Sequence, residues 1–351
     1  MFSTLYLHIG TPKTGTTAIQ QFMFSNRNTL AKYGCFVPDY KMNYPEIGNY
    51  RNAHWLIPKF RDEKSYSHNM NTLKKIAKKY KTIYMSDESI WNHCGFRPSF
   101  WGELKRDLAN IGIELKIIVY LRRQDIYLYS FWAELVRRGK VQSSNIRQYR
   151  AAKPLVMRHL NYYKYIKNGI MPEVGLSNIS IGIYERCRFV GEYGLLEDFL
   201  GRVNNMKLTD DLTLPQRNVN EGLRDVILEV RANLNHIEEF QKHPEYINYL
   251  LLKVQKRFKE EGRLRDRNTF FLNNREHFMR KFSNSNSKLA TNFLGRKDGI
   301  LFEDMQVEES EIPNFSNEEI VLACGYLIQE IQKDYLKKLG KDAVKRVLKR
   351  K

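Results

Sequence analysis

The chain has 351 residues, of which 42% are hydrophobic, and this composition excludes a disordered protein and suits one α/β core with a helical addition. Its 58 Lys and Arg exceed 39 Asp and Glu, and the net charge of +19 predicts attraction to polyanions, anionic lipid surfaces or anionic cofactors without choosing among them. The four cysteines are widely separated, so neither a zinc site nor a dense disulfide framework is indicated. We expect a cytoplasmic protein, because no stretch approaches the roughly 20 apolar residues of a membrane span and residues 1–4 lack a signal-peptide pattern.

The first predicted elements are a strand at residues 5–9 and a helix at residues 16–32. Between them lies Gly10-Thr11-Pro12-Lys13-Thr14-Gly15. A glycine-bounded loop at this place turns backbone N–H groups inward and places an anion at the helix N-terminus. Gly10 and Gly15 have the spacing of the nucleotide-triphosphatase loop, but Thr16 stands where that loop has its lysine. The segment therefore predicts a site for a phosphate-like group that Lys13 reaches from within the loop.

Short apolar runs alternate with helical patterns along the following residues, and this alternation predicts a parallel sheet covered by helices. The further strands are expected at residues 82–86, 116–121 and 179–184, and the further helices at residues 69–80, 100–110, 125–138 and 191–200. Ligands of such sheets bind beyond the carboxyl ends of the strands, where Lys13, Glu88 and Arg122 fall.

The character of the chain changes from about residue 206 onward, where it becomes helical, charged and rich in asparagine. Loops between helices are expected at residues 217–221 and 274–288. We therefore expect an α/β core at residues 1–205 and a mainly helical extension at residues 206–351 that packs on it.

The segment Pro12-Lys13-Thr14-Gly15-Thr16-Thr17 resembles the 5′-phosphosulfate loop of sulfotransferases that use 3′-phosphoadenosine 5′-phosphosulfate (PAPS), in particular the bacterial carbohydrate sulfotransferases. The resemblance implies a P-loop-like three-layer fold in which these six residues hold the 5′-phosphate and sulfonate of PAPS. That family also holds the 3′-phosphate with an Arg at a strand end and a Ser eight residues later, and Arg122 and Ser130 have this spacing. Many relatives have Asn-Pro after the Arg, whereas Arg123-Gln124 stand here; we assign Arg122 as the ligand. No metal is expected.

The resemblance also implies the reaction, which is transfer of a sulfonate to a hydroxyl or amine with 3′,5′-ADP as the leaving product. Such a transfer requires cationic donors at the sulfonate, which Lys13 would provide, and a base beside the acceptor. Glu88, just past the strand at 82–86, is the first choice, because glycan sulfotransferases often use Glu. His54 is the alternative, because cytosolic small-molecule sulfotransferases use His, whose usual pKa of roughly 6.5 suits a base near neutrality.

The expected acceptor is a saccharide or a glycoconjugate such as a glycolipid. Aromatic residues are dense between the loop and Glu88, and sugars pack their C–H faces on such rings, while Arg51 and Arg97 would orient acidic groups. The chain ends in residues 333–351, which combine apolar residues with many lysines, as in a basic amphipathic helix. This helix predicts either peripheral contact with an anionic membrane or packing on the core with a solvated basic face.

Two other functions stay open at this stage. A P-loop small-molecule kinase would need Lys after Gly15, which is absent, and a Mg²⁺-binding acid at a strand end, for which Asp87 is available. A basic nucleic-acid-binding protein would fit the net charge and the aromatic residues. No recognisable binding motif organises those residues, however, so no specific nucleic acid is expected as a partner.

Overall fold

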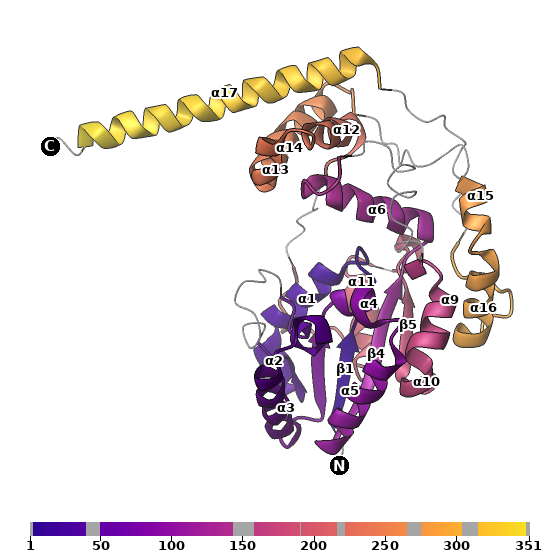
Figure 1. Cartoon of the computed structure of the whole chain (residues 1–351). Helices are drawn as coiled ribbons and strands as arrows, with labels where there is room; N and C mark the ends of the chain where they lie inside the picture. The colour runs from indigo at the N-terminus through magenta and orange to yellow at the C-terminus, as the bar shows by residue number, and fades with distance from the viewer. Residues whose placement is uncertain are drawn as a thin grey trace. The chain divides into compact units, whose positions relative to one another are not determined.

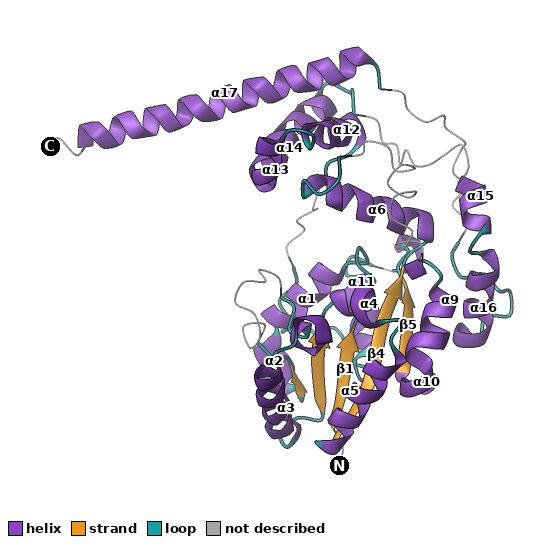
Figure 2. Cartoon of the chain, in the orientation of Figure 1, coloured by secondary structure: helices purple, strands orange, loops and turns teal. Residues whose placement is uncertain are grey.

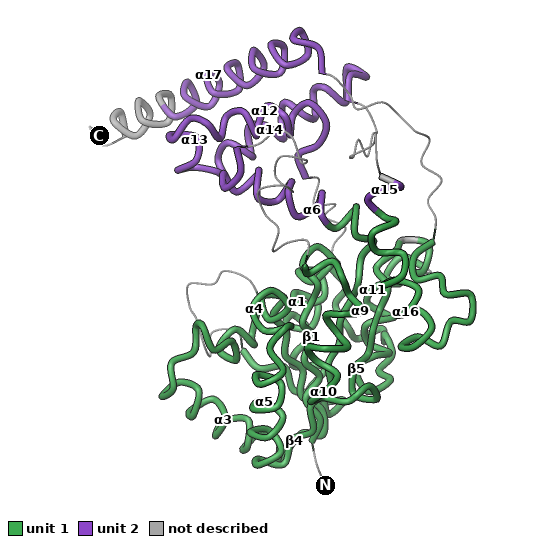
Figure 3. Tube along the Cα trace, turned by 45° about the vertical axis from the view of Figure 1, so that its right-hand side comes forward, with its two compact units in different colours: residues 1–127, 155–218, 279–305 green, residues 128–154, 219–278, 306–351 purple. Residues whose placement is uncertain are grey.

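The computed structural model describes residues 3–39, 50–142, 158–189, 191–215, 222–264, 275–303 and 315–348. The chain divides into two compact units (Figure 3). The first contains residues 1–127, 155–218 and 279–305, and the second contains residues 128–154, 219–278 and 306–351. This division differs from the single boundary expected at residues 205/206, because residues 128–154 belong to the second unit and residues 206–218 and 279–305 belong to the first.

The first unit is built on a five-stranded parallel sheet with the strand order β2-β3-β1-β4-β5 (Figure 2). Its strands are β1 (Ser3–His8), β2 (Cys35–Phe36), β3 (Thr82–Ser86), β4 (Ile113–Leu121) and β5 (Ile179–Ile183). Four of them lie where strands were predicted, and β2 was not predicted. The register pairs His8 with Ser86 on one side and with Ile118 on the other. The carboxyl ends of β1, β3 and β4 therefore meet at one edge.

Helices cover both faces of the sheet (Figure 1). Adjacent residues of a strand point to opposite faces, and apolar residues on both faces have to be buried. Leu5, Leu7 and Val119 belong to the core on one face, and Tyr6 and Tyr120 belong to the core on the other. The first face is covered by α3 (Glu63–Ala77), α4 (Ser89–Cys94), α5 (Pro98–Asn110), α9 (Tyr162–Tyr165), α10 (Met171–Val174) and α16 (Ser283–Leu294). The second face is covered by α1 (Thr16–Ser25), α2 (Arg27–Lys32) and α11 (Gly194–Arg202). This arrangement confirms the predicted P-loop-like three-layer α/β fold.

Short helical turns complete the first unit: η2 (His54–Leu56), η3 (Pro58–Phe60), the π-helical η4 (Ile166–Ile170), η5 (Leu176–Asn178) and η6 (Arg186–Arg188). The helix predicted at residues 16–32 is interrupted at Asn26, whose side-chain amide bonds the backbone of Thr213 in both directions, at 2.9 and 2.7 Å. The loop predicted at residues 274–288 is wrong, because α15 (Arg275–Arg280) and α16 occupy most of it. The loop predicted at residues 217–221 lies outside the described residues.

The second unit is helical throughout its described residues. Its helices are the part of α6 (Gln124–Arg137) from Leu128 onward, α12 (Asp225–Leu234), α13 (Glu238–Lys242), α14 (Pro244–Glu260), the part of α15 up to Phe278 and α17 (Asn317–Leu348). The long helix α17 packs on α12 and α14, where Ala323 and Leu327 are buried. The described helices include none with the length and apolar content required to cross a membrane.

Candidate functional site

The loop between β1 and α1 is fastened to the neighbouring strand β4. The backbone N–H and the hydroxyl of Thr11 both donate to the carbonyl of Tyr120, at 2.8 and 3.1 Å, and the Thr14 hydroxyl donates to the Thr11 carbonyl at 2.6 Å. Lys13 lies at the crest of this loop, beside Pro12. Thr16 and Thr17 form the first turn of α1. The predicted loop residues thus lie together at the carboxyl edge of the sheet, between the end of β1 and the start of α1.

Three observations make this loop suited to an anion. The helix α1 starts after Gly15 without a side-chain cap and without an acidic residue in its first turn, and the N–H groups and positive dipole end of such a helix start favour an anion. Gly10 and Gly15 have positive φ values of 94° and 76°, which glycine tolerates. Lys13 also has a positive φ, 68°, and a non-glycine residue in this conformation costs roughly 1–2 kcal/mol. Non-glycine residues in this conformation are uncommon and cluster at functional sites.

Arg122, at the end of β4, contacts this loop directly. Its Nη1 donates to the carbonyl of Lys13 at 2.8 Å, and its guanidinium lies over the ring of Tyr184 at 5.4 Å. The following Arg123 instead forms a buried two-bond pair with Asp125, at 2.9 and 2.8 Å. Of the two adjacent arginines, therefore, Arg122 faces the loop. Ser130 lies on α6 within the second unit, so the loop and Ser130 belong to separately described parts of the chain.

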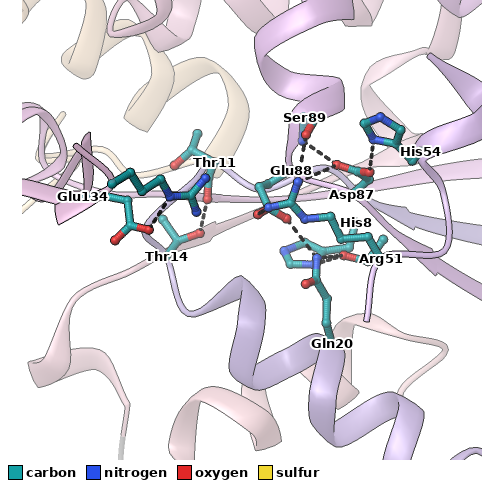
Figure 4. Close-up of polar contacts among 12 residues, drawn as sticks. His8, Thr11, Thr14, Gln20, Arg51, His54, Asp87, Glu88, Ser89 and Glu134 are labelled. Atoms are coloured by element: carbon teal, nitrogen blue, oxygen red, sulfur yellow. Dashed lines mark hydrogen bonds and ion pairs between the residues drawn. The ribbon is translucent and has the colours of Figure 1, made fainter. Parts of the chain in front are cut away.

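Glu88 lies on the other side of the loop, two residues after β3. A Cβ built on Gly10 would lie 2.9 Å from the Cβ of Glu88, so the start of the loop and Glu88 are in close contact. The Glu88 side chain is 12% exposed, and its Oε1 forms an ion pair with Arg51, while Gln20 donates to its Oε2 at 3.0 Å (Figure 4). Arg51, expected to orient acidic groups of an acceptor, thus contacts Glu88 itself.

His54 and Asp87 form a second pair beside Glu88. The Nδ1 of His54 lies 2.8 Å from Oδ2 of the buried Asp87, and Oδ1 of Asp87 accepts the N–H of Ser89 at 2.7 Å (Figure 4). The imidazole also stacks on Phe60, with ring centroids 4.6 Å apart. A carboxylate at Nδ1 selects the tautomer whose Nε2 carries the lone pair, which is the arrangement of a general base. The two base candidates are therefore close together, because His54 contacts Asp87 and Asp87 immediately precedes Glu88 in the chain. Their direct partners differ, since Glu88 is held by Arg51 and Gln20 and His54 by Asp87.

A series of hydrogen bonds between buried side chains links Glu88 to the sheet. Nδ1 of His8 lies 3.0 Å from the Ser86 hydroxyl, and the amide of Gln20 donates to the same hydroxyl at 3.0 Å as well as to Glu88. Complete burial lowers the pKa of His8 to about 3, so this imidazole is neutral. Sequence reasoning missed Gln20. The available signal was a polar residue on the buried face of α1, between Ile19 and Phe22.

Comparisons with known proteins give distant likenesses. No protein-family profile matches the chain. A relative from Archaeoglobus fulgidus, described as an uncharacterized protein, is 27% identical over 219 residues, which cover 58% of this chain and 52% of that protein. The chain thus spans about half the length of this relative. The crystal structure of a sulfotransferase from Alicyclobacillus acidocaldarius has a TM-score of 0.41 and 12% identity, and the match covers 66% of this chain and 95% of that one. At this distance neither likeness carries a conclusion about function.

Proposed function

We propose that the chain is a PAPS-dependent sulfotransferase of the cytoplasm that sulfates a hydroxyl or amine of a saccharide or glycoconjugate. The observation that carries this proposal is the loop Pro12–Thr17 between a central parallel strand and an uncapped helix, with Lys13 at its crest and Arg122 bonded to it. These residues suit the donor, because the loop leads into a helix N-terminus, contains Lys13 and is contacted by Arg122, and such a combination of N–H groups and cations favours an anion.

The roles of the residues follow from their positions. When bound, PAPS supplies the sulfonate and leaves as 3′,5′-ADP. Lys13, the loop N–H groups, Thr16 and Thr17 would hold the 5′-phosphate and the sulfonate oxygens, where negative charge develops during transfer. Arg122 and Ser130 would bind the 3′-phosphate, which ATP lacks. No residue in this scheme requires a metal.

The proton of the acceptor is the remaining requirement, and we propose Glu88 as its base. The acceptor oxygen forms its new bond to sulfur as its proton passes to the Glu88 carboxylate and the bond from sulfur to the 5′-phosphate oxygen breaks. The ion pair with Arg51 fixes the position of the Glu88 carboxylate at the carboxyl end of β3. Each carboxylate oxygen has two acceptor positions, so the bonds from Arg51 and Gln20 leave room for the acceptor hydroxyl. The His54–Asp87 pair is the alternative base, at the same edge of the sheet.

Calorimetric titration with 3′,5′-ADP tests the donor class. We expect micromolar binding of 3′,5′-ADP, weak binding of ATP with Mg²⁺, and loss of binding in Lys13→Met and Arg122→Met. The matched control is Arg106→Met, which removes an exposed arginine of α5. Preference for ATP with Mg²⁺ would support a kinase, and salt-sensitive binding of RNA or DNA without affinity for 3′,5′-ADP would support a nucleic-acid-binding protein. Absence of 3′,5′-ADP binding by the folded chain would overturn the proposal.

A further inference from the structure

The helix α17 carries an apolar surface that the other described residues of the second unit leave exposed. Val321, Ile328 and Tyr335 follow one another at intervals of seven residues, so they lie along one side of the helix, and Leu336 adjoins them. Their exposed fractions are 68% for Val321, 56% for Ile328, 62% for Tyr335 and 65% for Leu336. Four large apolar side chains this exposed on one helix indicate a contact with something outside the second unit.

This apolar surface is separate from the face by which α17 packs in the second unit. The packing face contains Leu327, which is buried, Glu330, which pairs with Lys253 at 3.5 Å, and Asp334, which accepts a hydrogen bond from Tyr246 at 2.8 Å. Substitutions on the exposed surface therefore leave the contacts with α14 in place.

The charge around the exposed surface identifies its partner. Residues 333–351 contain nine Lys or Arg and two Asp. The first of those acids, Asp334, is already engaged by Tyr246 and by Lys338 at 3.4 Å. The sequence of residues 333–351 thus has seven more basic than acidic side chains, nine minus two. Exposed apolar side chains on a helix with this basic composition match a surface that is negatively charged outside and apolar beneath, which is an anionic lipid bilayer.

We propose that α17 docks the protein on an anionic membrane surface, with Val321, Ile328, Tyr335 and Leu336 inserted at the interface and the lysines at the headgroups. A second copy of the chain would cover the apolar residues but would bring the same positive charges together, which opposes that pairing. The proposal is independent of the sulfotransferase activity, since it uses no residue of the candidate site.

Vesicle co-sedimentation of the full chain tests the proposal. We expect binding to vesicles that contain phosphatidylglycerol, weaker binding as salt rises, and none to vesicles of phosphatidylcholine alone. Ile328→Gln with Tyr335→Gln, which keeps charge and helix propensity, should weaken binding by about tenfold or more.

A charge pair and its control separate this docking from general attraction of a basic protein. Lys337→Gln with Lys338→Gln should also weaken binding by about tenfold. The matched control, Lys74→Gln with Lys75→Gln, makes the same charge change on exposed positions of α3 and should leave binding unchanged.

Three results would overturn the proposal. The first is an equal loss of vesicle binding in the α3 control. The second is absence of binding to anionic vesicles by a chain with native circular dichroism. The third is a dimer in light scattering that Ile328→Gln with Tyr335→Gln abolishes while vesicle binding persists. The last result would assign the apolar surface to a second copy.

Discussion

The buried imidazole of His8 should make the stability of the first unit depend on pH. The pKa of His8 is about 3 in the folded chain, against its ordinary value of 6.5, because burial disfavours the charged form. A lowered pKa means that the unfolded chain takes up the proton first as the pH falls. The contribution of His8 to the free energy of unfolding is therefore fully present above about pH 6.5, and the free energy of unfolding declines as the pH falls toward 3. Between about pH 8 and about pH 5 the loss is about 2 kcal/mol from this group alone.

Urea unfolding followed by tryptophan fluorescence measures this loss, because Trp55, Trp91 and Trp101 are all buried in the first unit. His8→Asn keeps a hydrogen-bonding group near the Ser86 hydroxyl but cannot ionise. It should be less stable at high pH, owing to the space left by the ring, yet lose about 2 kcal/mol less than the unchanged chain on acidification. His68→Asn, at an exposed position of α3, is the matched control and should keep the original pH slope. Equal slopes for His8→Asn and the unchanged chain would refute the reasoning.

Three further changes test the site and its support. Gly15→Ala should cost roughly 1–3 kcal/mol and abolish 3′,5′-ADP binding in calorimetry, because its φ is 76° and the new Cβ would lie 2.5 Å from Cδ2 of Leu195; native affinity would contradict a rigid loop. Glu88→Gln should lower the transfer rate about 10²–10⁴-fold while 3′,5′-ADP binding is kept, and His54→Gln should change the rate far less; the reverse order in a sulfonate-transfer assay would make His54 the base. Asn26→Ala should cost roughly 1–3 kcal/mol in thermal unfolding by leaving the Thr213 N–H unbonded, and an unchanged melting temperature would show that this link is not needed.

The strands were largely predictable, because parallel strands buried on both faces are continuous apolar runs. The runs at residues 82–86, 116–121 and 179–184 are of this kind. The strand β2 was missed because a strand of two residues is too short to show a pattern of apolar and polar residues. The helix α16 was missed because serine and asparagine at residues 283–287 are poor helix formers, whereas tertiary contacts such as the burial of Leu289 and Ala290 in the core favour the helix.

The candidate site was predictable where it depends on strand order and not where it depends on tertiary pairing. Glu88 and the loop meet because β3 and β1 are neighbours with parallel carboxyl ends, which the alternating pattern already implied. The pairing of Arg51 with Glu88 joins residues 37 apart in sequence, and no local pattern marks it. The same holds for Gln20, whose partner Glu88 lies 68 residues away.

The return of residues 279–305 to the first unit has a consequence for synthesis. All five strands are present once residue 183 has been made, yet Leu289, Ala290, Leu301 and Phe302 belong to the core on one face of the sheet. A nascent chain therefore carries a nearly complete sheet with part of one apolar face uncovered until more than a hundred further residues have left the ribosome. For the same reason a fragment that ends at residue 205 should aggregate, and no single cut in the gene separates the two units.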